Sequence, residues 1–263
     1  MHNNNNIVAI ASGKGGVGKT WFAIALARAL AGTGHRVLLF DGDLGLANID
    51  VQLGLHPRHD IADILAGRVA PEDAVLRHEG GFDILAGRSG NAALASLPET
   101  MLTALATIPG LIGVHYDIVL LDLAAGVDAT MRRLAAVAGG MLLLATAEPT
   151  SLTDAYAVLK RLARECPALE PAFVVNMAGS VAAGRATHAT LARAAAQFLG
   201  RTPKLAGIIR RDPAVPAAIR RQSLPPPGSP ACEDAAALAN AWFGAPQPVA
   251  RSGRRQEIHL AGG

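Results

Sequence analysis

Two lysines and a threonine stand in one short glycine-rich segment near the N-terminus, at a spacing typical of phosphate binding. The segment fits the pattern Gly-x-x-x-x-Gly-Lys-Thr, and its residues are Gly13, Lys14, Gly15, Gly16, Val17, Gly18, Lys19 and Thr20. Glycines allow consecutive backbone N–H groups to curl around phosphates. Lys19 is then expected to reach the β- and γ-phosphates, and the Thr20 hydroxyl to ligate Mg²⁺. The pattern predicts a binding site for a nucleoside triphosphate.

An apolar run precedes this loop and a helical stretch follows it. Residues 7–11 are typical of a buried strand, and residues 19–31 are expected as a helix. A helix that begins directly after the loop adds a favourable dipole for an anion. Strand, glycine loop and helix in this order favour nucleotide binding over a chance match of the pattern.

Three carboxylates stand at the ends of two further apolar runs. Asp41 and Asp43 follow residues 37–40, and Asp122 ends residues 117–122. A carboxylate at a strand end beside a phosphate loop can order Mg²⁺-bound water or position an attacking water. Asp122 fits the Walker B pattern, an aspartate at the tip of a buried strand near the metal. The alternative for these aspartates is a helix cap or a solvated turn.

The elements that must position these residues alternate along the chain as strand and helix. The runs expected as strands after the first are residues 36–40, 82–86, 117–121, 141–146, 172–176 and 205–209. Their continuous hydrophobicity suits strands covered on both faces. Residues 150–164 are the clearest helix between them. This order predicts an α/β fold: a doubly wound, mostly parallel sheet with helices on both faces, and ligands beyond the carboxyl ends of the strands.

One domain is expected to take up residues 1–243. No repeat or composition break divides the chain before residues 225–228, which form a Pro-rich surface connection. Residues 231–243 are expected as a last helix that returns Leu238, Trp242 and Phe243 to the core. Residues 244–263 have little to bury and are expected as a disordered C-terminal tail.

The bulk composition limits the class of protein. The chain has 263 residues, of which 51% are hydrophobic, enough for the core of one α/β domain. Its net charge of +3 is too small to argue for nucleic acid without clustered basic residues. Cys166 and Cys232 lie far apart without metal-ligand spacing. No hydrophobic run approaches the ~20 residues of a membrane-spanning helix, and no signal peptide is evident, so a cytoplasmic location is expected.

The extra lysine of the glycine loop, Lys14, makes the loop similar to the signature of a known family. The run Lys-Gly-Gly-Val-Gly-Lys-Thr, residues 14–20, resembles the deviant Walker A signature of the MinD/ParA ATPases, which are P-loop NTPases. The resemblance implies Mg²⁺-dependent hydrolysis of ATP to ADP and phosphate. It also implies a homodimer that forms on ATP binding, in which Lys14 reaches the partner's phosphates. A cation supplied in trans accelerates phosphoryl transfer by about 10³ to 10⁵. The alternative is a solvated loop lysine.

The same resemblance assigns roles to individual residues. The family's switch I region carries two aspartates, and the second positions the hydrolytic water. The residues expected to be catalytic are therefore Lys14, Lys19 and Asp43. Those expected around Mg²⁺, partly through water, are Thr20, Asp41 and Asp122. Leu123 stands where many relatives carry Thr or Ser, so a hydroxyl that could bond metal-bound water is missing here.

Nucleotide contacts outside the loop are expected on the same grounds at Glu148, Asn176, Arg210 and Asp212. Asn176 ends a strand, and its side-chain amide can hydrogen-bond both edges of an adenine ring. Arg210 and Asp212 lie where relatives place an Ile-Pro-x-Asp segment against the base, with Arg210 in place of the proline. Glu148 lies where relatives contact nucleotide across the dimer; the alternative is a surface glutamate before a helix.

Three segments of the sequence resemble one branch of this family more than the others. Residues 41–55, 122–126 and 148–156 are similar to the corresponding segments of the flagellar-number regulators FlhG and FleN, and the likeness covers roughly residues 6–243. This implies a slow, ATP-dependent dimerising switch that regulates flagellar number or placement. The implied partners are an FlhF-type GTPase, flagellar basal-body components or flagellar regulator proteins.

Relatives also end in an amphipathic helix that docks on the membrane. Such a helix needs a continuous apolar face opposite Lys and Arg. The tail offers three apolar and three basic side chains, Val249, Ile258, Leu260, Arg251, Arg254 and Arg255. This pattern does not support docking, so a peripheral position at the inner membrane or cell pole follows from the resemblance alone.

Three other readings compete with the switch. A ParA-like partition or positioning ATPase would bind nonspecific DNA through a basic cluster, here Arg210, Arg211, Arg220 and Arg221, which otherwise are solvated residues. An iron protein like nitrogenase reductase needs cysteines at the dimer seam, and Cys166 and Cys232 adjoin neither switch. A scaffold that binds ATP without hydrolysis would show no change in phosphate release when Asp43 is replaced by Ala.

Overall fold

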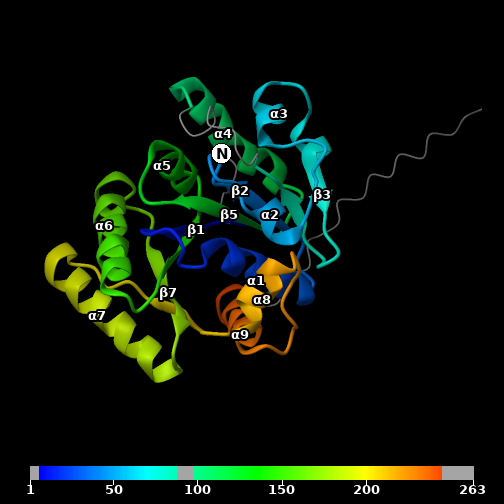
Figure 1. Ribbon diagram of the computed structural model, residues 1–263. Helices are drawn as coiled ribbons and strands as arrows, with labels where there is room; N and C mark the ends of the chain where they lie inside the picture. Colours follow the sequence, from blue (N-terminus) through cyan, green and yellow to red (C-terminus); the bar gives the residue numbers. More distant parts are fainter. Residues whose placement is uncertain (1–5, 88–96, 245–263) are drawn as a thin grey trace, which may run out of the picture.

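The sheet confirms the expected architecture. The computed structural model describes residues 6–87 and 97–244, and within them eight strands form one sheet in the order β3-β4-β2-β5-β1-β6-β7-β8 (Figure 1). The strands are β1 (Ile7–Ser12), β2 (Val37–Gly42), β3 (Val75–Arg77), β4 (Asp83–Leu85), β5 (Ile118–Ala125), β6 (Gly140–Ala145), β7 (Pro171–Ala178) and β8 (Leu205–Arg210).

The register of the central strands brings the expected site residues to one edge. Neighbouring strands are parallel except β3 and β4, so their carboxyl ends point the same way. Asp41 of β2 stands opposite Asp122 of β5, and Asp122 stands opposite Ile10 of β1. The phosphate loop leaves β1 at this same edge.

Helices cover both faces of the sheet. They are α1 (Lys19–Gly32), α2 (Ile49–Leu53), α3 (Ile61–Leu65), α4 (Glu99–Gly113), α5 (Ala129–Ala136), α6 (Pro149–Glu165), α7 (Val181–Leu199), α8 (Ala214–Arg220) and α9 (Pro230–Phe243), with a short 3₁₀ helix at Pro71–Ala74. In Figure 1, α1, α8 and α9 lie on one face and α4 to α7 on the other.

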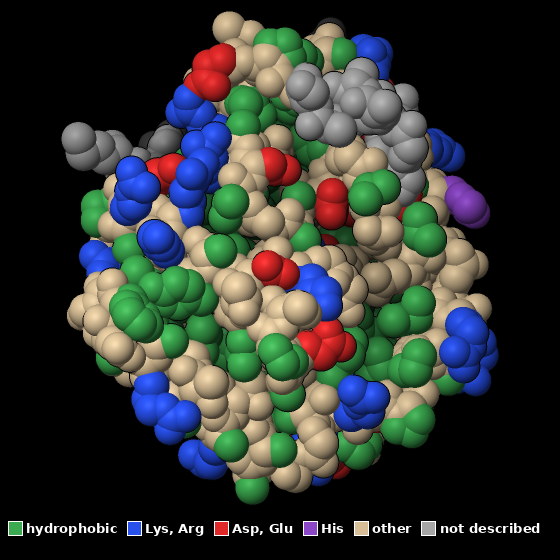
Figure 2. Space-filling view, turned by 60° about the vertical axis from the view of Figure 1, so that its left-hand side comes forward, with side chains coloured by type: hydrophobic (Ala, Val, Ile, Leu, Met, Phe, Trp, Pro, Cys, Tyr) green, Lys and Arg blue, Asp and Glu red, His purple; other side chains and the backbone are tan. Residues whose placement is uncertain are grey.

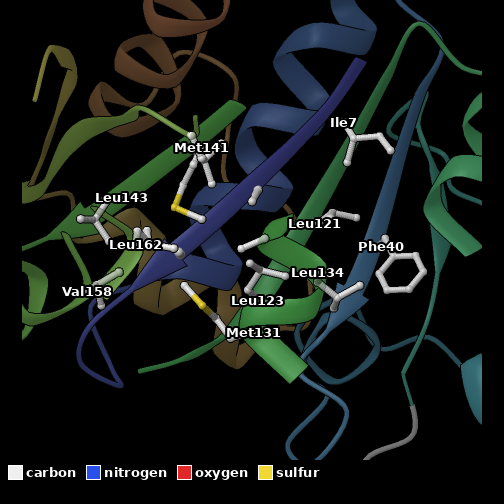
Figure 3. Close-up of a cluster of buried hydrophobic side chains, with 14 of the residues drawn as sticks. Ile7, Phe40, Leu121, Leu123, Met131, Leu134, Met141, Leu143, Val158 and Leu162 are labelled. Atoms are coloured by element: carbon white, nitrogen blue, oxygen red, sulfur yellow. The ribbon is translucent and has the colours of Figure 1, made fainter. Parts of the chain in front are cut away.

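Two layers of buried side chains fill the space between helices and sheet. The first joins α3 to α7 with the sheet and includes Ile7, Phe40 and Leu121 (Figure 3). The second lies under α1 and α9 and includes Phe22 and Leu238. Because successive strand residues point to opposite faces, strands buried on both sides read as continuous hydrophobic runs.

Some details differ from the sequence-based expectations. All seven expected strands are present, but β3 was not expected; it is three residues long and antiparallel to β4. Of the three side chains expected to return to the core from α9, Leu238 is 3% exposed and Phe243 packs against the core. The expectation was wrong for Trp242, which is 42% exposed and whose Nε1 donates to the Ala206 carbonyl at 2.9 Å. Among the described residues, no helix is long and apolar enough to cross a membrane. The expected tail lies outside them, apart from Gly244.

Two phenylalanines on neighbouring elements test the core. Phe173 of β7 is fully buried, whereas Phe198 of α7 is 67% exposed. We expect Phe173→Ala to lower the free energy of unfolding by about 3–5 kcal/mol, since it removes a large buried ring and leaves a cavity. The control Phe198→Ala should change it by no more than about 0.5 kcal/mol. Urea unfolding followed by circular dichroism measures both, and equal losses would contradict the core assignment.

Candidate nucleotide-binding site

The phosphate loop adopts the backbone conformation that its glycines permit. Gly16 and Gly18 have φ of 77° and 82°, a region that side chains disfavour. Gly18 is the residue before α1, so the loop runs directly into the first turn of that helix. Thr20 lies in this turn and is 8% exposed. The unpaired N–H groups of the turn and its dipole suit an anion.

The side chain of Asn176, in β7, is hydrogen-bonded to the phosphate loop. Its Nδ2 donates to the Val17 carbonyl at 2.7 Å, and its Oδ1 accepts from the backbone N–H of Met177 at 2.9 Å. A Cβ atom on Gly18 would come within 2.6 Å of this same Nδ2. Asn176 was expected at the base; in the structure its amide anchors the phosphate loop through the Val17 carbonyl and also accepts from the Met177 N–H.

Gly13 lets the backbone of helix α6 approach the loop. A Cβ atom at this position would lie 2.2 Å from the carbonyl carbon of Asp154 and 2.6 Å from the backbone nitrogen of Ala155. Real Cβ atoms do not approach backbone so closely, so only glycine fits here. The contact fixes the N-terminal part of α6 beside the phosphate loop.

Lys19 and Asp122 form a buried ion pair at the carboxyl edge of the sheet. The Lys19 Nζ lies 2.6 Å from Oδ1 of Asp122, and both side chains are less than a tenth exposed. The other carboxylate oxygen, Oδ2, is buried and has no hydrogen-bond partner within the described residues. A hard oxygen ligand left unpaired next to Thr20 fits a bound Mg²⁺ ion.

Asp41 is fully buried beside this pair. Its carboxylate accepts hydrogen bonds from the backbone N–H groups of Asp43, Asn48 and Ile49, at 3.1 to 3.2 Å. Burial, together with the nearby Asp122 carboxylate, raises the pKa of Asp41 to about 8. The Asp41 side chain therefore caps the start of α2 and also faces Asp122. Both interpretations from the sequence, a helix cap and a residue near the metal site, apply to it.

Asp43 lines a cavity of about 620 Å³ between the phosphate loop and the segment after β2. Burial raises the pKa of its carboxyl above the usual value. The cavity is also lined by Lys14, Lys19 and Asp128. Its size falls within the range of small-molecule sites. In Figure 2, acidic and basic side chains gather near the middle of the view, beside a hollow in the surface.

Lys14 lies on the outer side of this cavity and turns to α6. Its Nζ is 2.9 Å from Oε2 of Glu148 and 2.9 Å from Oγ1 of Thr150, in the first turn of that helix. The hydrogen bond from Lys14 lowers the pKa of the Glu148 carboxyl. Both side chains remain substantially exposed, at 38% and 65%. Solvent screens such a pair strongly, so it breaks at little cost.

A second cavity, of about 360 Å³, lies on the far side of Gly18. Its lining includes all three of the residues expected at the base end, together with two that were not expected: Asn176, Arg210, Asp212, Trp21 and Met177. The Arg210 guanidinium turns to α9, where its Nε lies 2.8 Å from Oδ2 of Asp234. Asp212 accepts from the backbone N–H of Ala214 at 2.8 Å.

Three features of the site were not expected from the sequence. Asp128 caps α5 by accepting from the Met131 N–H at 2.7 Å, and its place soon after β5 was the available signal. Trp21 directly follows Thr20 on α1. Met177 has φ of 54°, unusual for a residue other than glycine, and nothing in the sequence marks it.

The burial of Leu123 accounts for a hydrophobic residue at this position. Leu123 is fully buried and packs with Met131 and Leu134 of α5 (Figure 3). Because neighbouring strand residues point to opposite faces, Leu123 faces the core where Asp122 faces the cavity. This position therefore contributes to packing in the present chain.

Neither Arg210 of the basic cluster nor the two cysteines form a metal or redox site among the described residues. Arg210 is ion-paired with Glu233 and Asp234 of α9. Within residues 6–87 and 97–244, no group of three or more His, Cys, Asp or Glu side chains is arranged to hold a metal ion. Cys166 and Cys232 are free thiols.

Comparison with known proteins agrees with this geometry. Residues 8–225 match the family model of the CobQ/CobB/MinD/ParA nucleotide binding domain. The antiactivator FleN of Pseudomonas aeruginosa is 38% identical over 216 residues, 82% of this chain and 77% of FleN. The flagellum site-determining protein YlxH of Helicobacter pylori is 31% identical over 193 residues, 73% of this chain and 65% of YlxH. MinD of Pyrococcus horikoshii OT3, solved with Mg-ADP, has a TM-score of 0.75 and 25% identity, covering 90% of this chain and 95% of MinD.

The contact between Gly13 and α6 can be tested by adding one methyl group. We expect Gly13→Ala to weaken ADP binding roughly 10- to 100-fold, since overpacking costs about 1–3 kcal/mol and must displace the loop or the helix. Gly140→Ala is the matched control, because a Cβ atom there meets nothing within 4 Å and the residue begins β6, at the end of the sheet opposite the loop. Isothermal titration calorimetry measures both affinities. Equal affinity in the two variants would show that the loop does not depend on this contact.

Proposed function

Because the chain belongs to the CobQ/CobB/MinD/ParA nucleotide-binding family, we propose that it is a Mg²⁺-dependent ATPase that works as a dimerising switch. The observation that carries the proposal is that the two lysines of the loop have different environments. Lys19 is buried at the carboxyl edge of the sheet, whereas Lys14 lines the outer part of the cavity and forms an exposed ion pair with Glu148. One lysine serves the chain's own nucleotide, and the other is free to serve a second copy.

In the proposed mechanism Lys19 exchanges partners when ATP binds. Its ammonium leaves Asp122 for the β- and γ-phosphates, and the loop N–H groups receive the phosphate oxygens. Thr20 and Asp122, with Asp41 beside them, are the residues that would hold Mg²⁺. A Mg²⁺ ion held there would neutralise negative charge on the phosphates. A cation here would also favour the charged form of Asp41, whose pKa burial raises to about 8.

Lys14 acts in trans in this proposal. Two chains close with their cavities facing each other, and each Lys14 leaves Glu148 and Thr150 for the phosphates of the partner chain. Its charge then meets the charge that develops on the transferred phosphoryl group, an effect worth about 10³ to 10⁵ in rate. Glu148, once released, faces the same interface and is proposed to contact nucleotide across it.

Asp43 completes the hydrolytic site. It lines the cavity with Lys14 and Lys19, and its position beside the loop suits a carboxylate that orients the attacking water. Slow turnover is proposed, because the time spent in the closed dimer is the output of a switch. Asn176, Arg210 and Asp212 are proposed to hold the base end, with Asn176 also anchoring the loop.

The output is proposed to be control of flagellar number or placement. The support is the similarity to the antiactivator FleN and to the flagellum site-determining protein YlxH over most of this chain. The proposed partners are an FlhF-type GTPase, basal-body components or a flagellar transcription regulator. A cytoplasmic protein that also visits the inner membrane or the cell pole would serve such partners.

A pull-down with trapped and empty baits tests this function. Asp43→Ala is expected to bind ATP, dimerise and hydrolyse at a small fraction of the wild-type rate, so it holds the closed state. Lys19→Ala is the control, because it lacks the cation that receives the phosphates. With ATP present, flagellar GTPase, switch or regulator proteins should be enriched on the Asp43→Ala bait alone, as measured by mass spectrometry. Identical proteins on both baits would contradict the switch, and recovery of bulk DNA would favour partition.

A further inference from the structure

Trp21 lines the cavity that the proposed function assigns to the base of the nucleotide. It directly follows Thr20 in the first turn of α1, so its position is fixed by the same loop that holds the phosphates. The side chain is 5% exposed and lines the 360 Å³ cavity together with Gly18. A nucleotide with its phosphates in the loop would have to pass Gly18 to place its base in this cavity.

The indole nitrogen of Trp21 is a buried donor without a protein acceptor. Its Nε1 is buried and makes no hydrogen bond within the described part of the chain. Indole offers one N–H donor and no acceptor, so only a partner with a lone pair can satisfy it. The other tryptophan shows the usual outcome, because Nε1 of Trp242 donates to the Ala206 carbonyl at 2.9 Å. Buried polar groups left unpaired are rare and call for an explanation.

The cavity around Trp21 has the character of a site for a flat heterocycle. Apolar side chains make up most of its wall, and these include Met177, Pro213, Val215, Pro216 and Ile219. Among the described residues that line it, Trp21 alone is aromatic. Stacking on an aromatic ring is a common way to hold a base. Purine nitrogens and ribose oxygens provide the acceptors that the indole N–H requires.

We propose that Trp21 contacts the bound nucleotide directly. Its ring forms a wall against the base and ribose, and its Nε1–H donates a hydrogen bond to an acceptor at that end of the ligand. Trp21 thereby contributes to the preference for a nucleotide over a bare polyphosphate. The inference rests on the proposed function only in taking an adenine nucleotide as the ligand, and it needs neither dimerisation nor hydrolysis.

Substitution of each tryptophan by phenylalanine separates this role from packing. Trp21→Phe keeps an aromatic ring and removes the N–H group, and Trp242→Phe is the matched control. ADP and tripolyphosphate are the two probes, because tripolyphosphate can fill only the phosphate loop. We expect Trp21→Phe to weaken ADP binding about 3- to 10-fold, the usual effect of one hydrogen bond, and to leave tripolyphosphate binding unchanged. Trp242→Phe should bind both as the wild type does.

Fluorescence gives a second readout that does not need the Trp21→Phe variant to fold. In Trp242→Phe the remaining emission comes from Trp21, and it should change with ADP but not with tripolyphosphate. A purely structural role would weaken both ligands alike in Trp21→Phe, and that result would overturn the proposal. Unchanged ADP affinity together with unchanged Trp21 emission would also overturn it. A wild-type protein that binds no ADP would reject the nucleotide function itself, which is a distinguishable outcome.

Discussion

The close approach of two backbones sets the geometry of the whole site. The loop at Gly13 lies against the Asp154–Ala155 peptide of α6, in a space that no other residue type fills without displacement. This contact brings the first turn of α6 within reach of Lys14. The ammonium of the second loop lysine is therefore held by Glu148 and Thr150 at the start of the chain's own helix α6. The trans role proposed for Lys14 depends on this arrangement more than on any single charge.

Buried charge is the second constraint on the site. Three ionisable groups, Lys19, Asp41 and Asp122, meet at the carboxyl edge of the sheet with little solvent. Lys19 and Asp122 neutralise each other, and the raised pKa of Asp41 lets that carboxyl keep its proton near neutral pH. Bound phosphates would take over Lys19 as their cation, and a divalent cation would take over the Asp122 and Asp41 carboxylates. The protein without ligand is thus already balanced, which accounts for how such a polar site folds at all.

Much of this could be predicted because it is local in sequence. Residues 13–20 encode the loop by their own spacing, and Asp41 and Asp122 follow short hydrophobic runs that are typical of strands inside a sheet. The hold of Asn176 on Val17 and the pairing of Arg210 with Asp234 join residues far apart, so no pattern along the chain marks them. The position of Trp242 could not be predicted from helical spacing: its neighbour Phe243 packs against the core, whereas Trp242 is 42% exposed and donates to the Ala206 carbonyl of β8.

Complementation between two inactive variants tests the central claim that Lys14 works in trans. Lys14→Ala keeps Asp43 and lacks the trans lysine; Asp43→Ala supplies that lysine to a partner. Each alone should release phosphate far more slowly than the wild type. Mixed in equal amounts with ATP, they should recover roughly a quarter of the wild-type rate, since half of the dimers would be mixed and hold one complete site each. No recovery, while light scattering shows that mixed dimers form, would contradict the account.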